Sequence, residues 1–598
     1  MKLAKSTLAK TLVLAIILAL ALAACGRGDN DGDAGDTPPP VATPTPAPAD
    51  TADDDDDDAD VEDTVRESVT VSMFALGDVP MSSLDDNFGR RIYEEIGVEI
   101  LFIPVAGSAT EAAMMMLAAQ DWGTLDIIPL WGAVWEHIAA GALVNLDNHR
   151  DVLPNFFSFH EDTIPYKRTF DRENHGLYFW QAGPDQLQMT TPPLDMVVRT
   201  DALEALGWPV LDTTDDYIEF LRAALELIPE SGGMRSIGMS GFWGAGGGLG
   251  PLVASYLPRH SGMSHPYNVT LLVDPATQSF VCQISHPYSR ATWEFWNTLW
   301  REGIMDREIW TDSHADLQAK LNAGVPISAH FMNWAVTQAN RFAVDRGDYH
   351  MQYIVMPIRL SAATTNRRYE IINMSRADEF TGILSSSENI DRILELINLV
   401  SQDEFRRLFG YGIEGEDHTV VNGQFVMTPY FIQNATGPDS AAWLNARGFL
   451  HSYIRLPMRQ MALGADGQAG RFTHHPLYRD AIATERMNEA YRMLGWAHST
   501  YGWMNSPHFE FIPFDISRYQ SALLFEVDSP EQLAFQRIDD FITAQIPFLV
   551  NAPTVEEFDR LYQELVDQVV AMGIDEVVQR ANDDLAVIHE LIESLRGR

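Results

Sequence analysis

The chain of 598 residues is strongly acidic: 84 aspartates and glutamates against 41 lysines and arginines give a net charge of −43 at neutral pH. Such a charge repels nucleic-acid phosphates, which excludes a DNA- or RNA-binding function. The length exceeds what one hydrophobic core usually organises, so we expect at least two folded units. The sequence contains no H-E-x-x-H string, and the adjacent His474 and His475 lack zinc-site spacing, so we expect no metal and no cofactor.

The N-terminus has the layout of an export signal. Lys2, Lys5 and Lys10 precede an apolar run over 12–24 that is too short for a bilayer span. The run ends in small residues before Cys25, which resembles the bacterial lipoprotein signal. This resemblance implies cleavage before Cys25, acylation of its thiol and anchoring in the membrane. The alternative is an ordinary secreted protein in which Cys25 has no role.

Residues 25–66 are expected to form a disordered tether. They consist largely of Gly, Asp, Pro, Thr and Ala, with an unbroken run of aspartates over 53–58. Such a segment has too little apolar surface to offset the entropy of ordering, and its like charges repel. With Cys25 acylated, Cys282 has no partner, so we expect no internal disulfide.

The first folded unit alternates strands and helices. Residues 68–76, 98–102 and 125–130 are predicted strands. A helix over 84–96 is predicted from the spacing of its apolar residues, with Gly97 as its end, and a second helix is predicted around Met114. This order indicates a parallel sheet covered by helices, an α/β fold. Ligands bind beyond the carboxyl ends of such strands, which places Trp131, directly after the third strand, at the mouth of a site.

From Val69 onward the chain resembles the extracellular solute-binding proteins of family 1, the carbohydrate-binding relatives of maltose-binding protein, and most closely their large Gram-positive lipoproteins. Six strings carry the resemblance: GVE at 97–99, DII at 126–128, VVRTDALEALGW at 197–208, WREGIMD at 300–306, YGIEGEDHTV at 411–420 and MGIDEV at 572–577. Arg301 and Met305 depart from the family pattern. Little matches over 423–529, which leaves the identity of the ligand open.

The resemblance implies a two-lobe periplasmic-binding-protein-like fold of the hinged type II, in which the chain crosses between the lobes more than once and a ligand lies in the cleft. The implied bounds are a lipoprotein signal peptide at 1–24, a linker at 25–66, the first lobe at 67–198, the second lobe at 199–382, a return segment of the first lobe at 383–425, and the rest of the second lobe with the C-terminal helices at 426–598.

Sugar recognition needs flat aromatic faces and planar polar groups. The candidates that combine these side chains with predicted loops are Trp131, Trp243, Asn333, Trp334, Glu379 and Trp503. Three of them have a plainer alternative: Trp131 packing on a lobe surface, Glu379 in a solvated charge cluster, Trp503 in a core contact. The glycines after Trp243 match no nucleotide-binding pattern.

The expected function is that of a lipid-anchored substrate-binding component of an ABC importer, on the extracellular face of the cell membrane. Its expected partners are a carbohydrate ligand and the transmembrane subunits of the permease, and we expect no enzymatic activity. An exported polysaccharide-active enzyme is the first alternative, although no nucleophile–base pattern supports it. A sensory lipoprotein that presents its ligand to a receptor is the second.

Overall fold

The computed structural model describes most of the chain from residue 67 onward. The described residues are 67–75, 82–105, 109–130, 134–181, 196–242, 257–258, 261–264, 268–330, 333–372, 380–437, 439–449, 453, 455–459, 467–496, 510–525 and 529–596. Arg66–Arg598 forms a compact unit by itself. Of the helices in these ranges, none has the length and apolar character needed to cross a membrane.

The first sheet has the strand order β2-β1-β3-β14-β4. β1, β2 and β3 are parallel, and β14 runs antiparallel to its neighbours β3 and β4. Its strands are β1 (Val69–Phe74), β2 (Val98–Ile103), β3 (Ile127–Pro129), β4 (Phe179–Gln181) and β14 (Phe380–Ile383). The strands expected over 68–76, 98–102 and 125–130 are thereby confirmed.

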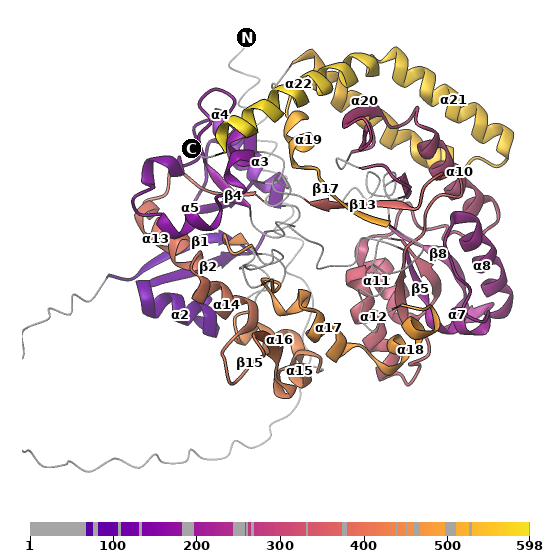
Figure 1. Ribbon diagram of the computed structural model, residues 1–598, viewed down its shortest axis with the longest axis horizontal. Coiled ribbons are helices and arrows are strands. Elements are labelled where there is room, and N and C mark those ends of the chain that lie inside the picture. Colours follow the sequence, from indigo (N-terminus) through magenta and orange to yellow (C-terminus); the bar gives the residue numbers. More distant parts are fainter. Residues whose placement is uncertain are drawn as a thin grey trace, which may run out of the picture. The chain divides into compact units, whose positions relative to one another are not determined.

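Both faces of the first sheet are buried. Successive residues of a strand point to opposite faces, so Ile127 packs into one apolar group and Ile128 into another. The first group includes α2 (Asn87–Ile96), α5 (Pro154–Phe159), α13 (Ile390–Val400) and α14 (Asp403–Tyr411), and the second includes α3 (Ala109–Ala119) and α4 (Val134–Ala139). We call the two groups together the first core (Figure 1).

The helix predicted over 84–96 is confirmed from Asn87 onward but begins later than expected. Asp86 is its N-cap and accepts a hydrogen bond from Gly89 N at 2.8 Å, so the helix cannot continue backward through it. Leu84 lies instead in the 3₁₀ turn Ser83–Asp85. Gly97 ends the helix as predicted, with a φ of 65° that favours glycine.

The second sheet has the order β12-β5-β11-β8. Its strands are β5 (Met196–Arg199), β8 (Ile237–Ser240), β11 (Pro326–Ala329) and β12 (Tyr353–Met356). β8 and β11 are parallel, and β5 is antiparallel to β11 and β12. On β12, Ile354 packs into one apolar group and Val355 into another, so this sheet is also buried on both faces. These two groups form the second core.

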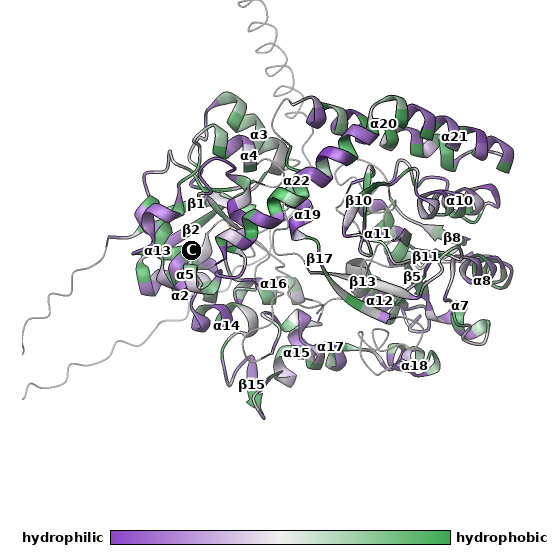
Figure 2. Cartoon of the chain, turned by 45° about the horizontal axis from the view of Figure 1, so that its top comes forward, coloured by the Kyte–Doolittle hydropathy of each residue, from purple (hydrophilic) through white to green (hydrophobic). Residues whose placement is uncertain are grey.

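Helices cover both faces of the second sheet. One face carries α7 (Thr200–Ala205), α8 (Thr214–Leu227) and α10 (Pro287–Arg301), and the other carries α11 (His314–Ala323) and α12 (Asn333–Asp345). The second core also receives the C-terminal helices α19 (Ser517–Ala522), α20 (Pro530–Val550), α21 (Val555–Ala571) and α22 (Ile574–Leu595). Figure 2 shows apolar and polar residues alternating along α20 to α22, as expected for helices buried on one side.

The chain passes between the sheets more than once. β4 belongs to the first sheet and β5 to the second, and β14 returns to the first sheet after β12. β13 (Arg367–Ile372) lies between β12 and β14 in sequence and pairs in parallel with β17 (Glu510–Asp515). This is the α/β architecture with repeated crossings that the sequence predicts; the exact residue bounds of the lobes stay predictions.

The region over 423–529, which matches little in the family, contributes to three cores. Tyr453 packs in the first core and Tyr491 in the second. A separate group that includes Tyr411, Phe431, Phe472 and Tyr478 forms what we call the satellite core. Its elements are β15 (His418–Val421), β16 (Gln424–Met427), α15 (Pro429–Ala435), α16 (Ser440–Ala446) and α17 (Pro476–Ile482), and α18 (Glu485–Met493) follows in the chain.

The chain also forms two short hairpins, β6–β7 (Glu230–Ser231, Met234–Arg235) and β9–β10 (Leu271–Asp274, Ser279–Cys282).

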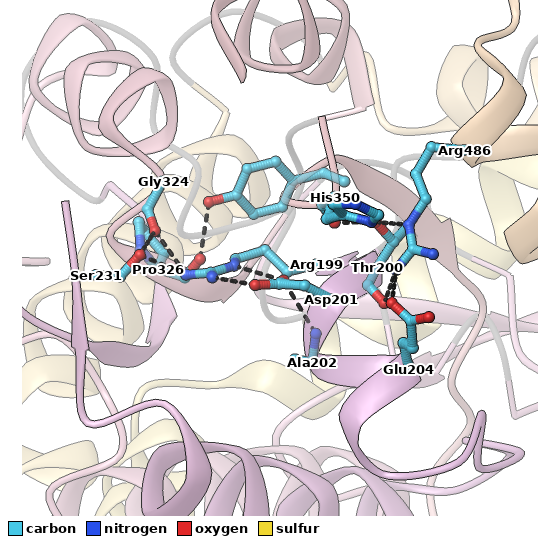
Figure 3. A network of polar contacts seen from close by, with 11 residues as sticks. Arg199, Thr200, Asp201, Ala202, Glu204, Ser231, Gly324, Pro326, His350 and Arg486 are labelled. Atoms are coloured by element: carbon cyan, nitrogen blue, oxygen red, sulfur yellow. Dashed lines mark hydrogen bonds and ion pairs between the residues drawn. The ribbon is translucent and has the colours of Figure 1, made fainter. Parts of the chain in front are cut away.

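A buried arginine network fixes the amino edge of β11 (Figure 3). Arg199 is 1% exposed and donates to both carboxylate oxygens of Asp201, at 2.9 and 2.5 Å. Its remaining nitrogen donates to Ser231 Oγ at 2.8 Å and Gly324 O at 2.7 Å. Charge-assisted, bidentate pairs of this kind are the strongest hydrogen bonds in proteins. Arg199 therefore joins β5 to the segment that enters β11.

We expect Arg199→Met to destabilise the protein by about 3 kcal/mol, because it leaves the Asp201 carboxylate without its buried partner. Arg222→Met is the matched control: Arg222 also pairs bidentately, with Glu302, but is half exposed, so its loss should cost below about 1 kcal/mol. Urea unfolding of both variants measures the difference. Equal losses would contradict the role assigned to Arg199.

Asp86 and Tyr453 join two segments that are far apart in the sequence. Tyr453 Oη donates to Asp86 Oδ2 at 2.9 Å, and the Tyr453 ring packs against Phe88 and Phe102. Burial raises the pKa of the Asp86 carboxyl to about 6, against the opposing effect of the hydrogen bond from Gly89 N. The contribution of Asp86 to stability therefore depends on pH.

A carboxyl whose pKa is higher in the folded state binds an extra proton there between about pH 4 and 6, so the free energy of unfolding falls as the pH rises through that window. For Asp86 the fall amounts to about 3 kcal/mol at most. Asp86→Asn keeps the helix cap and should remove this part of the slope in urea unfolding between pH 4 and 7. The exposed control Asp567→Asn should keep it, and an unchanged slope in Asp86→Asn would contradict the assignment.

Candidate ligand-binding site

Two predicted ligand residues directly follow or precede paired strand ends of the first sheet. β3 ends and β14 begins at the same edge, where Leu130 N donates to Phe380 O at 2.7 Å. Trp131 directly follows Leu130, and Glu379 directly precedes Phe380. Both residues themselves lie outside the described ranges. Their segments nevertheless leave the sheet from paired positions, at the edge where α/β proteins bind ligands.

The second sheet brings the other predicted segments to one edge in the same way. β8 and β11 are parallel, with Ser240 opposite Ala329, and His330 N donates to Ser240 O at 3.0 Å. Trp243 follows Ser240 by three positions but lies outside the described residues. Asn333 and Trp334 are the first residues of α12, directly beyond the end of β11. Trp503 precedes β17 and also lies outside the described residues.

The structure thus shows which strand ends precede or follow the predicted residues in the chain. The contacts of these residues with a ligand stay predictions. Trp131 and Glu379 flank paired strand ends of the first sheet in the sequence, and Trp243, Asn333 and Trp334 follow β8 and β11 of the second. Cys25 lies outside the described residues, and Cys282 is a free cysteine in β10.

Two pairs of aromatic side chains lie near the carboxyl ends of β8 and β11. Trp296 of α10 and His330 meet edge to face with ring centroids 5.2 Å apart, and each is 2% exposed. Phe242 meets His314 in the same way at 5.6 Å. Within the described part of the chain, the Trp296 indole nitrogen has no hydrogen-bond partner. Sequence reasoning missed Trp296, because within a helix an aromatic residue gives no signal beyond helical spacing.

An ion-pair cluster anchors the end of β8. Lys320 Nζ lies 2.9, 2.7 and 2.6 Å from carboxylate oxygens of Asp306, Glu308 and Asp312. Ser240 Oγ donates to Asp306 at 2.6 Å, which ties the cluster to the last residue of the strand. Burial raises the pKa of Asp312, against the effect of the Lys320 ammonium. Carboxylates in this arrangement have the chemistry of a hard-cation site, but the Lys320 ammonium occupies the space between them.

The two edges of the second sheet thus differ in character. The amino edge of β11 carries the Arg199 network, in which Arg199 makes four hydrogen bonds to protein acceptors. The carboxyl edge carries the ring contacts of Trp296 with His330 and of Phe242 with His314.

Comparison with known proteins identifies the fold. No protein-family model matches the sequence, and no curated protein is a significant match. Among solved structures, the alginate-binding protein AlgQ2 without calcium ion matches with a TM-score of 0.56 and 13% identity, over 86% of this chain and 97% of that chain. An HMO-binding, ABC-transporter-associated solute-binding protein from Bifidobacterium longum infantis matches with a TM-score of 0.55 and 14% identity, over 87% and 99%.

A third match is the S. pneumoniae ABC-transporter substrate-binding protein FusA in complex with kestose, with a TM-score of 0.56 and 12% identity, over 88% of this chain and 100% of that chain. The likeness thus spans nearly the whole described chain and the whole of each neighbour. The resemblance seen in the sequence is confirmed at the level of fold: the chain has the two-lobe α/β fold of the solute-binding proteins of ABC transporters.

Proposed function

We propose that the chain is the substrate-binding component of an ABC importer and captures a sugar or oligosaccharide between its two lobes. The observation that carries the proposal is the pairing of the strand ends that flank the predicted ligand segments, β3 with β14 and β8 with β11. The neighbours support it, because they are binding proteins of transporters, and FusA is in complex with kestose. The same comparison supports binding without turnover.

Capture and delivery would proceed by population shift. A sugar ring stacks on an aromatic platform such as Trp334, while its hydroxyls pair with Asn333 or a nearby carboxylate such as Glu379. A ligand that contacts both lobes binds the closed state better than the open one and shifts the population toward it. The closed form then docks on the permease subunits, and the importer's ATPase supplies the energy.

The charge of the chain narrows the class of ligand. A net charge of −43 opposes the approach of a polyanion. AlgQ2 binds alginate, whereas FusA is in complex with the neutral sugar kestose. We therefore propose a neutral oligosaccharide for this chain.

A calorimetric and thermal-shift panel tests the proposal with the purified full chain. Neutral fructo-, malto- and manno-oligosaccharides form one arm, and alginate oligomers form the other. Saturable binding in the neutral arm, with a higher melting temperature, is the expected result. Cleavage of an oligosaccharide would support an exported enzyme instead, and no binding in either arm would refute the proposal.

Trp334 gives the sharpest site prediction. Trp334→Ala should weaken binding by about 1–3 kcal/mol, the range for burying one apolar face. Trp334→Phe should keep most of the affinity, because a smaller ring still offers a stacking face. Trp443→Phe, in the satellite core, is the control and should bind as the parent chain does. Unchanged calorimetric affinity in Trp334→Ala would remove Trp334 from the site.

The proposed anchor at Cys25 makes a separate prediction. In a bacterial host that processes lipoproteins, the parent chain should sediment with membranes, and Cys25→Ser should move it to the soluble fraction because the acyl chains are lost. Cys282→Ser is the matched control and should stay with the membranes. Equal distribution of parent and Cys25→Ser would show that the chain is not lipid-anchored at this residue.

A further inference from the structure

α17 is part of the satellite core, which is continuous with the first core. Tyr478 of α17 packs in the satellite core together with Tyr411, the last residue of α14. Phe409, two residues earlier on α14, packs in the first core. Tyr411 Oη donates to Ala469 O at 2.5 Å, and the guanidinium carbon of Arg471 lies 5.0 Å from the centre of the Phe409 ring. α17 is thereby held to the first core through α14.

α18, the next helix in the chain, is held to the second core. Arg486 is 4% exposed and donates to Glu204 at 2.7 Å and to Thr200 O at 3.1 Å, both in α7 (Figure 3). Thr484 Oγ1 donates to Gln352 Oε1 at 2.5 Å, next to β12. Tyr491, later in α18, is buried among second-core residues. These contacts attach α18 along its length.

Only two residues join these oppositely attached helices. Ala483 is the C-cap of α17, and Thr484 is the N-cap of α18, where it accepts a hydrogen bond from Met487 N at 3.1 Å. Two residues span at most about 7 Å. A second contact lies nearby in the fold: Arg341 of α12 donates to Ser440 Oγ of α16 at 3.2 Å, again from the second core to the satellite core.

We propose that the α17–α18 connection, Ala483–Thr484, is a second pivot between the lobes, in addition to the strand crossing at β13 and β17. Because two residues span so short a distance, the connection limits how far the lobes can separate at this end. The inference concerns the motion of the lobes and does not depend on what the ligand is.

Spin labels at Glu94→Cys in α2 and Glu226→Cys in α8 report the separation of the lobes in the ligand-free full chain that also carries Cys25→Ser and Cys282→Ser. Both label positions are exposed. A Gly-Ser-Gly-Ser insertion between Ala483 and Thr484 adds up to about 13 Å of reach. Pulsed electron–electron double resonance should then show a broader distribution of the distance between the two labels. The distribution should extend to longer distances by up to that amount.

The matched control is the same insertion between Ala276 and Thr277, in the turn of the β9–β10 hairpin, which lies wholly on the second core. It should leave the distances unchanged. Arg486→Ala, which loosens α18 without altering the chain path, should broaden the distribution in the same direction as the first insertion. An unchanged distribution after the Ala483–Thr484 insertion would overturn the proposal, and so would equal broadening in the hairpin control.

Discussion

The organisation of this protein follows from burial of each of its two main sheets on both faces. Ile127 and Ile128 on β3, or Ile354 and Val355 on β12, send adjacent side chains into separate apolar groups, so neither face is left for a ligand. A site built on such a sheet has to use the strand ends. The pairing of Leu130 with Phe380, and of Ser240 with Ala329, then decides which segments meet there. The proposed binding of a ligand between the lobes is thus consistent with how the cores are filled.

Local sequence patterns were sufficient for the first folded unit. Apolar spacing located β1, β2, β3 and the body of α2, because each is governed by residues within one turn or one strand. Spacing placed Leu84 inside α2, and the Asp86 cap excludes it, since capping competes with periodicity at a helix end. For the predicted site, the structure describes only the strand ends next to the candidate residues. The strand ends that flank Trp131 and Glu379 are paired, which the sequence separation of these residues does not reveal.

The remaining features rest on pairs that no local pattern encodes. Asp86 and Tyr453 are separated by 367 positions, and Thr200 and Arg486 by 286. Lys320 pairs with three carboxylates from a preceding segment, which in sequence resembles an ordinary solvated run of charge. The region 423–529 matches little in the family, yet its residues enter three cores and join two of them at Ala483–Thr484. Its contribution is to the connection between lobes, and composition gives no hint of it.

Small-angle X-ray scattering of the full chain, with and without a saturating neutral oligosaccharide, tests the central claim most directly. Closure of two hinged lobes on a sugar predicts a smaller radius of gyration in the saturated sample, with a dependence on ligand concentration that follows calorimetric binding. Saturable binding that leaves the radius of gyration unchanged would contradict an account in which the ligand is trapped between moving lobes.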